Sequence, residues 1–137
     1  MPVKQKKDNV KYVIMDRDRR KKLIAALNDC VVHCNHCADV CLDAKDIEAM
    51  VVCIRTDRVC AEVCATLAKV LSTSYNDVGD LIKYCHRLCL SCATECEKHE
   101  HKHCQDCAEA CKKCASACKD MLMKYETSLI QQDENYL

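Results

Sequence analysis

The sequence contains no Phe and no Trp, and its 137 residues include only one Gly and one Pro. With so few helix breakers, and with many Ala, Leu, Lys and Glu, the chain is expected to be helical. Basic and acidic residues balance at 21 each, so nothing indicates a nucleic-acid partner. No apolar run is long enough to cross a membrane. The length suits one domain with a modest core.

We also expect no export signal. The apolar stretch Val10–Met15 is interrupted by Lys11 and is too short for a secretory signal. Arg19 and Arg20, followed by the five-residue run Leu23–Leu27, resemble a twin-arginine signal only faintly. The basic run Arg19–Lys22 is interpreted as a solvated helix start. We therefore expect a cytoplasmic protein whose thiols are kept reduced.

Cysteine, in contrast, is abundant, with 16 residues. Most of them follow one spacing, with three residues between neighbours, then two, then three. Steps of three and four return to the same face of an α-helix, so each set forms one stripe where a soluble helix would normally carry Leu or Ile. The cysteines are Cys30, Cys34, Cys37, Cys41, Cys53, Cys60, Cys64, Cys85, Cys89, Cys92, Cys96, Cys104, Cys107, Cys111, Cys114 and Cys118.

Four helical segments carry these stripes, and in the second of them Asp57 occupies one stripe position. Four amphipathic helices with short connections can bury such faces only against one another, which predicts an all-α fold, an antiparallel four-helix bundle with a Cys-lined core. The expected helices are Asp18–Leu42, Asp46–Leu71 with Asp46 as N-cap, a third after the connection Ser72–Asn76 that ends near Lys98, and a fourth after Glu97–Lys102 that ends near Tyr125.

The expected bundle comprises residues 17–125. Residues 1–16 are interpreted as an N-terminal arm, and residues 126–137 as a polar, frayed C-terminal tail. Up-down threading brings four cysteines and a His-rich connection to one end, which we call the mouth: Cys41, Cys53, Cys96 and Cys104, with His99, His101 and His103. The other end should be closed by apolar side chains, which we call the plug: Leu23, Leu27, Leu67, Leu71, Leu81, Ile82, Met121, Leu122 and Tyr125.

Four kinds of thiol chemistry fit a cysteine-rich chain. Disulfides do not suit a reducing compartment, and iron–sulfur clusters need cysteines on loops that wrap a cluster. Zinc or cadmium could take four-thiolate sites, but each zinc site of this kind carries two uncompensated negative charges, and about four of them would bury roughly eight charges. Copper(I) is soft and monovalent, so about one ion per thiolate leaves the core neutral.

The spacing also suits small sulfur pairs. Side chains at i and i+4 of a helix lie about 5–6 Å apart at Cβ, so two such sulfurs can clasp one ion, and neighbouring pairs can share sulfurs across the bundle. The predicted pairs are Cys30 with Cys34, Cys37 with Cys41, Cys60 with Cys64, Cys85 with Cys89, Cys92 with Cys96, Cys107 with Cys111, and Cys114 with Cys118.

Two stretches carry a family resemblance, Cys53–Cys64 (CIRTDRVCAEVC) and Cys92–Cys107 (CATECEKHEHKHCQDC). Through residues 30–118 the chain resembles the cytosolic branch of the four-helix-bundle copper storage proteins. The resemblance implies a homotetramer of bundles that stores many copper(I) ions on core thiols, with His residues near the open end. The N-terminal arm lies outside the resemblance.

The remaining candidate ligands are weighed by position. His99, His101 and His103 lie beside Cys104 at the mouth, which favours metal contact by at least one of them. His33 borders the first stripe, and both a hydrogen-bonding role and metal ligation are considered for it. His36 and His86 are interpreted as surface residues. Met50 could lend a thioether, but filling a gap is the commoner role. A buried Asp57 needs an ion pair or hydrogen bonds, with Arg55 or Arg58 as possible partners and a structural role near the metals.

Function follows from this ligand set. The sequence predicts a cytosolic copper(I) storage and sequestration protein that is not an enzyme, because neither a nucleophile–base pair nor a substrate cleft is visible. The predicted ligands are all 16 cysteines together with His99, His101 and His103. The alternatives are a zinc or cadmium sink like a metallothionein and an iron–sulfur or redox protein.

Overall fold

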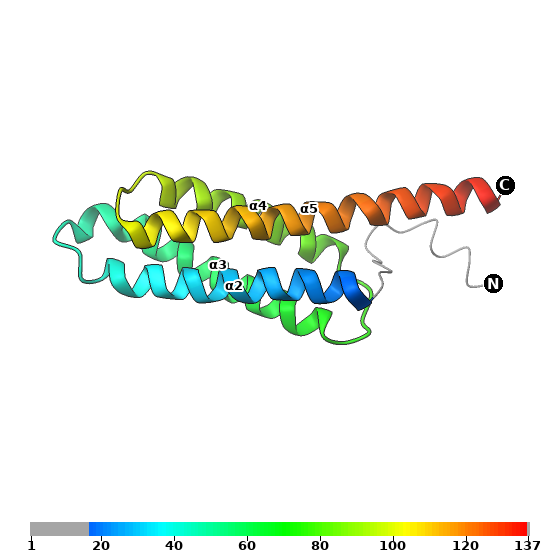
Figure 1. Ribbon diagram of the computed structural model, residues 1–137, viewed down its shortest axis with the longest axis horizontal. Coiled ribbons are helices and arrows are strands. Elements are labelled where there is room, and N and C mark those ends of the chain that lie inside the picture. The colour runs from blue at the N-terminus through cyan, green and yellow to red at the C-terminus, as the bar shows by residue number, and fades with distance from the viewer. Residues whose placement is uncertain (1–16, 137) are drawn as a thin grey trace.

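A computed structural model describes the backbone of residues 17–136 and the side chains of residues 17–123. Four helices make up this part of the chain: α2 (Arg17–Cys41), α3 (Ile47–Leu71), α4 (Gly79–Glu97) and α5 (Lys102–Tyr136). They run up and down along one long axis (Figure 1). The predicted antiparallel four-helix bundle is confirmed. The predicted arm, residues 1–16, lies outside the described residues.

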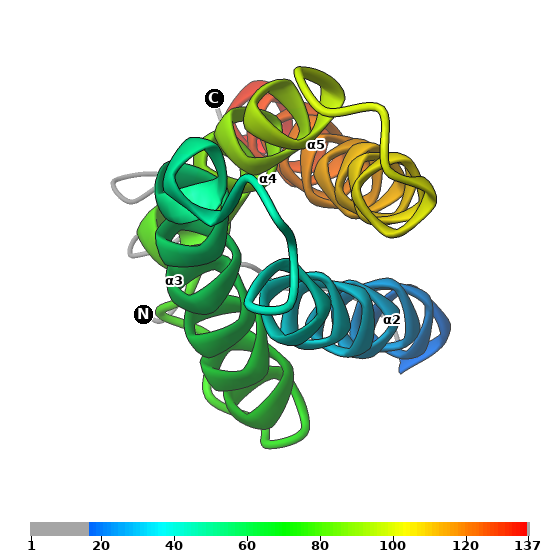
Figure 2. The same cartoon turned by 90° about the vertical axis from the view of Figure 1, so that its left-hand side faces the viewer.

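Each helix packs against two others, so that the four form a closed ring around the axis. Contacts join α2 to α3, α3 to α4, α4 to α5 and α5 to α2, and the ring is visible when the bundle is viewed from one end (Figure 2). Stripes at three- and four-residue spacing therefore all point to one central core. None of the helices in the described part of the chain has both the length and the apolar character needed to span a membrane.

Helix ends agree with the sequence prediction except at the C-terminus. The fourth helix was expected to end near Tyr125 and to be followed by a frayed tail, but α5 continues to Tyr136 and projects past the end of the bundle (Figure 1). No Gly or Pro follows Tyr125, so the polar composition did not stop the helix. Asp46 is the N-cap residue of α3, as predicted, but its side chain makes no capping hydrogen bond.

The plug closes one end with hydrocarbon. Leu27, Leu67 and Ile82 are completely buried, and Leu81 and Leu122 are partly buried against them. Val78, at the start of α4, also belongs to this cluster and was not predicted. Tyr125 lies outside the residues whose side chains are described. One end of the bundle core is therefore apolar, and the sulfur stripes begin directly beyond it.

Arg20 fastens the plugged end and corrects the prediction of a purely solvated basic run. Its guanidinium donates hydrogen bonds to the carbonyls of Leu71 at 3.1 Å and Thr73 at 2.7 Å, and to Oδ1 of Asn76 at 2.8 Å. These acceptors lie at the end of α3 and in the connection to α4. Arg20 thus supplies donors to carbonyls that the end of a helix leaves without partners.

Candidate metal centre

The bundle axis is filled with thiols. All 16 cysteines are free, and every one is completely buried. The stripes lie on the inner faces of all four helices, where Ala residues such as Ala61, Ala93 and Ala108 fill the space beside them. Small side chains allow the helices to approach closely, so sulfur takes the place that branched hydrocarbon has in an ordinary bundle.

Sulfur atoms lie close together both along and across the helices. Along one helix, Sγ atoms are 3.8 Å apart for Cys30 and Cys34 and 3.9 Å apart for Cys60 and Cys64. Cys37 and Cys41 also lie at 3.9 Å. Across helices the separations are 3.6–4.0 Å. These spacings allow two or three sulfurs to bind one soft ion.

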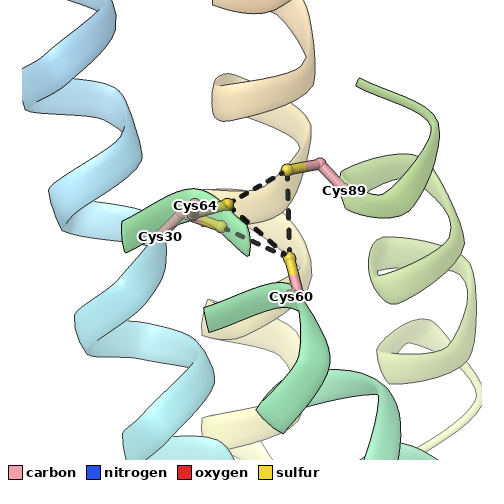
Figure 3. A group of neighbouring side chains, drawn as sticks. All are labelled: Cys30, Cys60, Cys64 and Cys89. Atoms are coloured by element: carbon pink, nitrogen blue, oxygen red, sulfur yellow. Dashed lines mark hydrogen bonds between the residues drawn. The ribbon is translucent and has the colours of Figure 1, made fainter. Parts of the chain in front are cut away.

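Groups of four thiols form candidate sites in which every Sγ lies within 4.8 Å of the others. Figure 3 shows one of them, in which Cys30 from α2 and Cys89 from α4 face Cys60 and Cys64 from α3. Four further groups among the described residues also draw on three helices each. They are Cys30, Cys34, Cys60 and Cys111; Cys34, Cys92, Cys107 and Cys111; Cys64, Cys85, Cys89 and Cys114; and, at the mouth, Cys37, Cys41, Cys53 and Cys104.

Sulfurs are shared between neighbouring groups. Cys64 and Cys89 join two groups, Cys34 and Cys111 join two others, and Cys30 and Cys60 link these two pairs of groups. The inner groups therefore form a continuous series along the axis. Thiolates that bridge several ions suit such a series better than isolated single-ion sites, because each sulfur has neighbours on both sides.

The structure supports most of the predicted i,i+4 cysteine pairs. Beyond the three pairs with direct Sγ contacts, Cys85 and Cys89 share one four-thiol group, and Cys107 and Cys111 share another. Cys92 and Cys96 meet through Asp57, to which both donate hydrogen bonds. The pair Cys114 and Cys118 stays a prediction.

Asp57 lies within the sulfur core and is completely buried. Its Oδ1 accepts hydrogen bonds from Cys92 at 3.2 Å, Cys96 at 3.4 Å and Cys107 at 3.5 Å, and its Oδ2 accepts one from Cys53 at 3.7 Å. Thiols, and not the suggested arginines, are thus its partners. Asp57 contacts Cys53 and Cys96 on the mouth side and Cys92 and Cys107 on the inner side.

Burial changes the protonation of these groups. Loss of water, and then the nearby charge of Cys107, raises the pKa of Asp57 from 3.8 to about 8. Burial likewise raises the pKa of the Cys41 thiol to about 11. In contrast, hydrogen bonds from Cys37 and Cys96 lower the pKa of Cys53. Without metal, the core therefore retains most of its protons, and any ion that binds must displace them.

Three histidines surround the mouth, each with a different partner. His103 Nε2 lies 3.4 Å from Cys41 Sγ, and its ring stacks on His101 at a centroid distance of 5.2 Å. His101 Nε2 lies 3.7 Å from Oδ1 of Asp46, and His99 Nε2 lies 3.2 Å from Oε2 of Glu95. Burial lowers the pKa of His103, which keeps its ring neutral and able to bind a metal ion.

Other candidates take ordinary roles. His33 Nδ1 lies 3.0 Å from the carbonyl oxygen of Asp29, the hydrogen-bonding alternative of the two considered. His36 is exposed and His86 is partly exposed, as predicted. Met50 is completely buried within the core cluster, in agreement with filling a gap.

Comparison with known proteins identifies the family. A sequence profile described as copper storage protein matches residues 16–123. That range contains all 16 cysteines. The chain belongs to the copper storage protein family. Sequence and structure had pointed to this family through the stripes, the closed plug and the His-rich mouth.

Individual known proteins align over most of the chain. A cysteine-rich protein of Bacillus subtilis, YhjQ, is 42% identical over 98 residues, which is 72% of this chain and 91% of that protein. A cytosolic copper storage protein from Streptomyces lividans, with five coppers, superposes with a TM-score of 0.75 at 38% identity, over 78% of this chain and 94% of that one. The Cu(I)-bound copper storage protein BsCsp3 superposes with a TM-score of 0.72 at 40% identity, over 75% of this chain and 97% of that one.

Proposed function

We propose that this chain is a cytosolic store that takes up many copper(I) ions on its core thiolates and so also sequesters them. The proposal names all 16 cysteines as ligands, with His99, His101 and His103 as contacts at the mouth. Support comes from the family, from relatives with bound copper, one of them described as cytosolic, and from the buried four-thiol groups. Storage of this kind requires binding and release but no catalysis.

The decisive observation concerns charge. Among residues with described side chains, Asp57 is the one buried polar or charged residue, so this core contains no Lys or Arg to balance thiolates. A divalent ion in a four-thiolate group would leave two negative charges per site, which is costly away from water. One copper(I) ion per thiolate leaves no net charge, and release of the thiol protons completes the exchange.

A zinc or cadmium sink is the second candidate, because the four-thiol groups also suit a tetrahedral ion. Zinc–sulfur bonds of about 2.3 Å place tetrahedral sulfurs nearly 4 Å apart, similar to the 3.6–4.0 Å seen here. Distances alone therefore do not separate the two ions. Charge balance and the shared sulfurs favour copper(I).

Parallel titrations test this proposal. The reduced, metal-free protein is titrated with Cu(I) and, separately, with Zn²⁺ under anaerobic conditions, and a competing chelator removes loosely held metal. Copper should reach a plateau near the number of cysteines, 16, or slightly above it if His residues hold more. Zinc should saturate at far fewer ions and with weaker binding. A copper plateau near a quarter of the cysteine count would instead indicate four-sulfur sites.

We also propose a homotetramer, as the family resemblance implies. Several large apolar side chains remain exposed on the isolated chain, among them Val32 and, on α3, Val51, Val52 and Val59. Contacts with other copies would remove such surface from water. Analytical ultracentrifugation should give about four times the chain mass of 15.6 kDa. A monomer at micromolar concentration would contradict this assembly.

A further inference from the structure

His99 is held at both its backbone and its ring. It lies between α4 and α5, where its backbone N–H donates to the carbonyl of Cys96 at 3.1 Å. The side-chain amide of Gln105, on α5, donates to its carbonyl. Its Nε2 lies 3.2 Å from Oε2 of Glu95, one turn earlier on α4. Such restraint exceeds what a solvated loop residue needs.

The pair of Glu95 and His99 is shielded from water. The side chain of His99 is only 12% exposed and that of Glu95 only 13%. In contrast, the side chain of His101 is 42% exposed and that of its partner Asp46 is 58% exposed. The other oxygen of Glu95, Oε1, accepts a hydrogen bond from Lys98 at 3.1 Å, which steadies the carboxylate. Shielding strengthens a hydrogen bond, because water competes less for its donor and acceptor.

A carboxylate is an acceptor only, so Nε2 of a neutral His99 must carry the proton in this contact. The lone pair then lies on Nδ1. A nearby carboxylate or carbonyl commonly fixes a metal-binding His in this manner and raises the basicity of the ligand nitrogen. His99 also lies at the mouth, since its backbone N–H donates to the carbonyl of Cys96, one of the mouth cysteines.

We propose that Glu95 is a positioning residue, which holds the His99 ring in one tautomer and orientation with Nδ1 free to receive copper(I) at the mouth. This inference rests on the proposed function, because it assumes that His99 contacts copper. His103 differs from His99, since its Nε2 is the nitrogen near a core sulfur. The two histidines therefore present different nitrogens to the mouth.

The first measurement concerns the metal-free protein. In the unmodified chain, proton NMR should show a downfield, slowly exchanging Nε2 proton on His99, because the hydrogen bond is shielded. Glu95→Ala should abolish this signal, and Glu95→Gln, which keeps an acceptor oxygen, should retain it in weakened form. Asp46→Asn changes the carboxylate beside the exposed His101 and is the matched control, which should leave the His99 signal unchanged. If the signal is absent from the unmodified chain or survives in Glu95→Ala, the positioning role is wrong.

The second measurement is the rate of anaerobic Cu(I) uptake. Loss of a group that orients a metal ligand typically lowers metal affinity or activity about 10-fold to 100-fold. We therefore expect Glu95→Ala to slow copper uptake about tenfold. Glu95→Gln should recover most of the rate. In a His99→Ala background the Glu95→Ala change should have no further effect, since Glu95 acts through His99.

Outcomes separate this inference from the proposed function. Unchanged uptake in His99→Ala would refute the role of His99 at the mouth, whatever the NMR signal shows. Slow uptake in His99→Ala, with equal further slowing when Glu95→Ala is added, would show that Glu95 acts through its charge on the approaching ion, and would overturn the positioning role. A Glu95→Gln rate as low as that of Glu95→Ala would do the same.

Discussion

Asp57 provides a quantitative test of the metal-free core. Its carboxyl is completely buried among four thiols, and burial raises its pKa from 3.8 to about 8. The folded state therefore keeps a proton that the unfolded chain releases as pH rises above 3.8. Stability from this group is fully present below pH 3.8 and is lost as pH rises toward 8.

The size of the effect follows from this pKa difference. At 1.36 kcal/mol per pH unit, the free energy of unfolding should fall by about 4 kcal/mol between pH 4 and pH 7 through Asp57 alone. In the Asp57→Asn variant, the amide side chain carries no charge at any of these pH values and has nearly the same shape as the carboxyl. The variant should match the unmodified protein near pH 4 and exceed its stability by about 3–4 kcal/mol near pH 7.

Guanidinium unfolding followed by far-ultraviolet circular dichroism measures this difference, with a strong reductant and a copper chelator present. Comparing the two chains removes the contribution of groups that titrate independently of Asp57, which both chains share. Glu62→Gln, an exposed carboxyl on the same helix, is the control and should keep the pH dependence of the unmodified protein. A stability difference between Asp57→Asn and the unmodified chain that stays constant from pH 4 to pH 7 would refute the reasoning.

Three further predictions concern the two ends and the metal-free fold. Arg20→Ala removes hydrogen bonds from a charged donor and should lower the free energy of unfolding by about 1–2 kcal/mol; Lys21→Ala, at an exposed neighbour, should change it little. The reduced metal-free protein should already be helical by circular dichroism, because the plug and the protonated thiols pack without metal. Copper should then raise its melting temperature. An unfolded spectrum of the metal-free protein would contradict the first expectation. Replacing His99, His101 and His103 with Ala should slow both copper uptake and chelator-driven removal, while most of the copper capacity remains. Unchanged rates of uptake and removal would show that copper does not enter at the mouth.

The bundle and its sulfur core could be predicted because periodicity alone determines which residues point inward. Spacing of three and four residues placed all 16 cysteines on inner faces, and the structure buries every one. Up-down threading also brought distant residues together correctly. Cys41 and Cys104, for example, lie 3.9 Å apart at the predicted mouth, and His103 lies beside them.

Contacts that depend on the exact height of one helix against another could not be predicted. The thiol partners of Asp57 come from α3, α4 and α5, and helix register decides which sulfurs reach its oxygens. Arg20 was missed because its acceptors lie at the end of α3 and in the following connection, whose path the sequence does not specify. The pair of Glu95 and His99 had a visible signal, the i,i+4 spacing of two side chains that can interact on a helix.

Whether copper occupies the core is tested most directly by anomalous X-ray diffraction at the copper absorption edge, on crystals of this chain loaded anaerobically. Copper peaks should lie along the bundle axis from the mouth, near Cys41 and Cys104, to the last sulfurs before the plug, near Cys118. Each peak should lie within bonding distance of two or three Sγ atoms, with any additional copper beside the mouth histidines. Copper confined to surface carboxylates or histidines, with the core thiols unoccupied, would contradict the account.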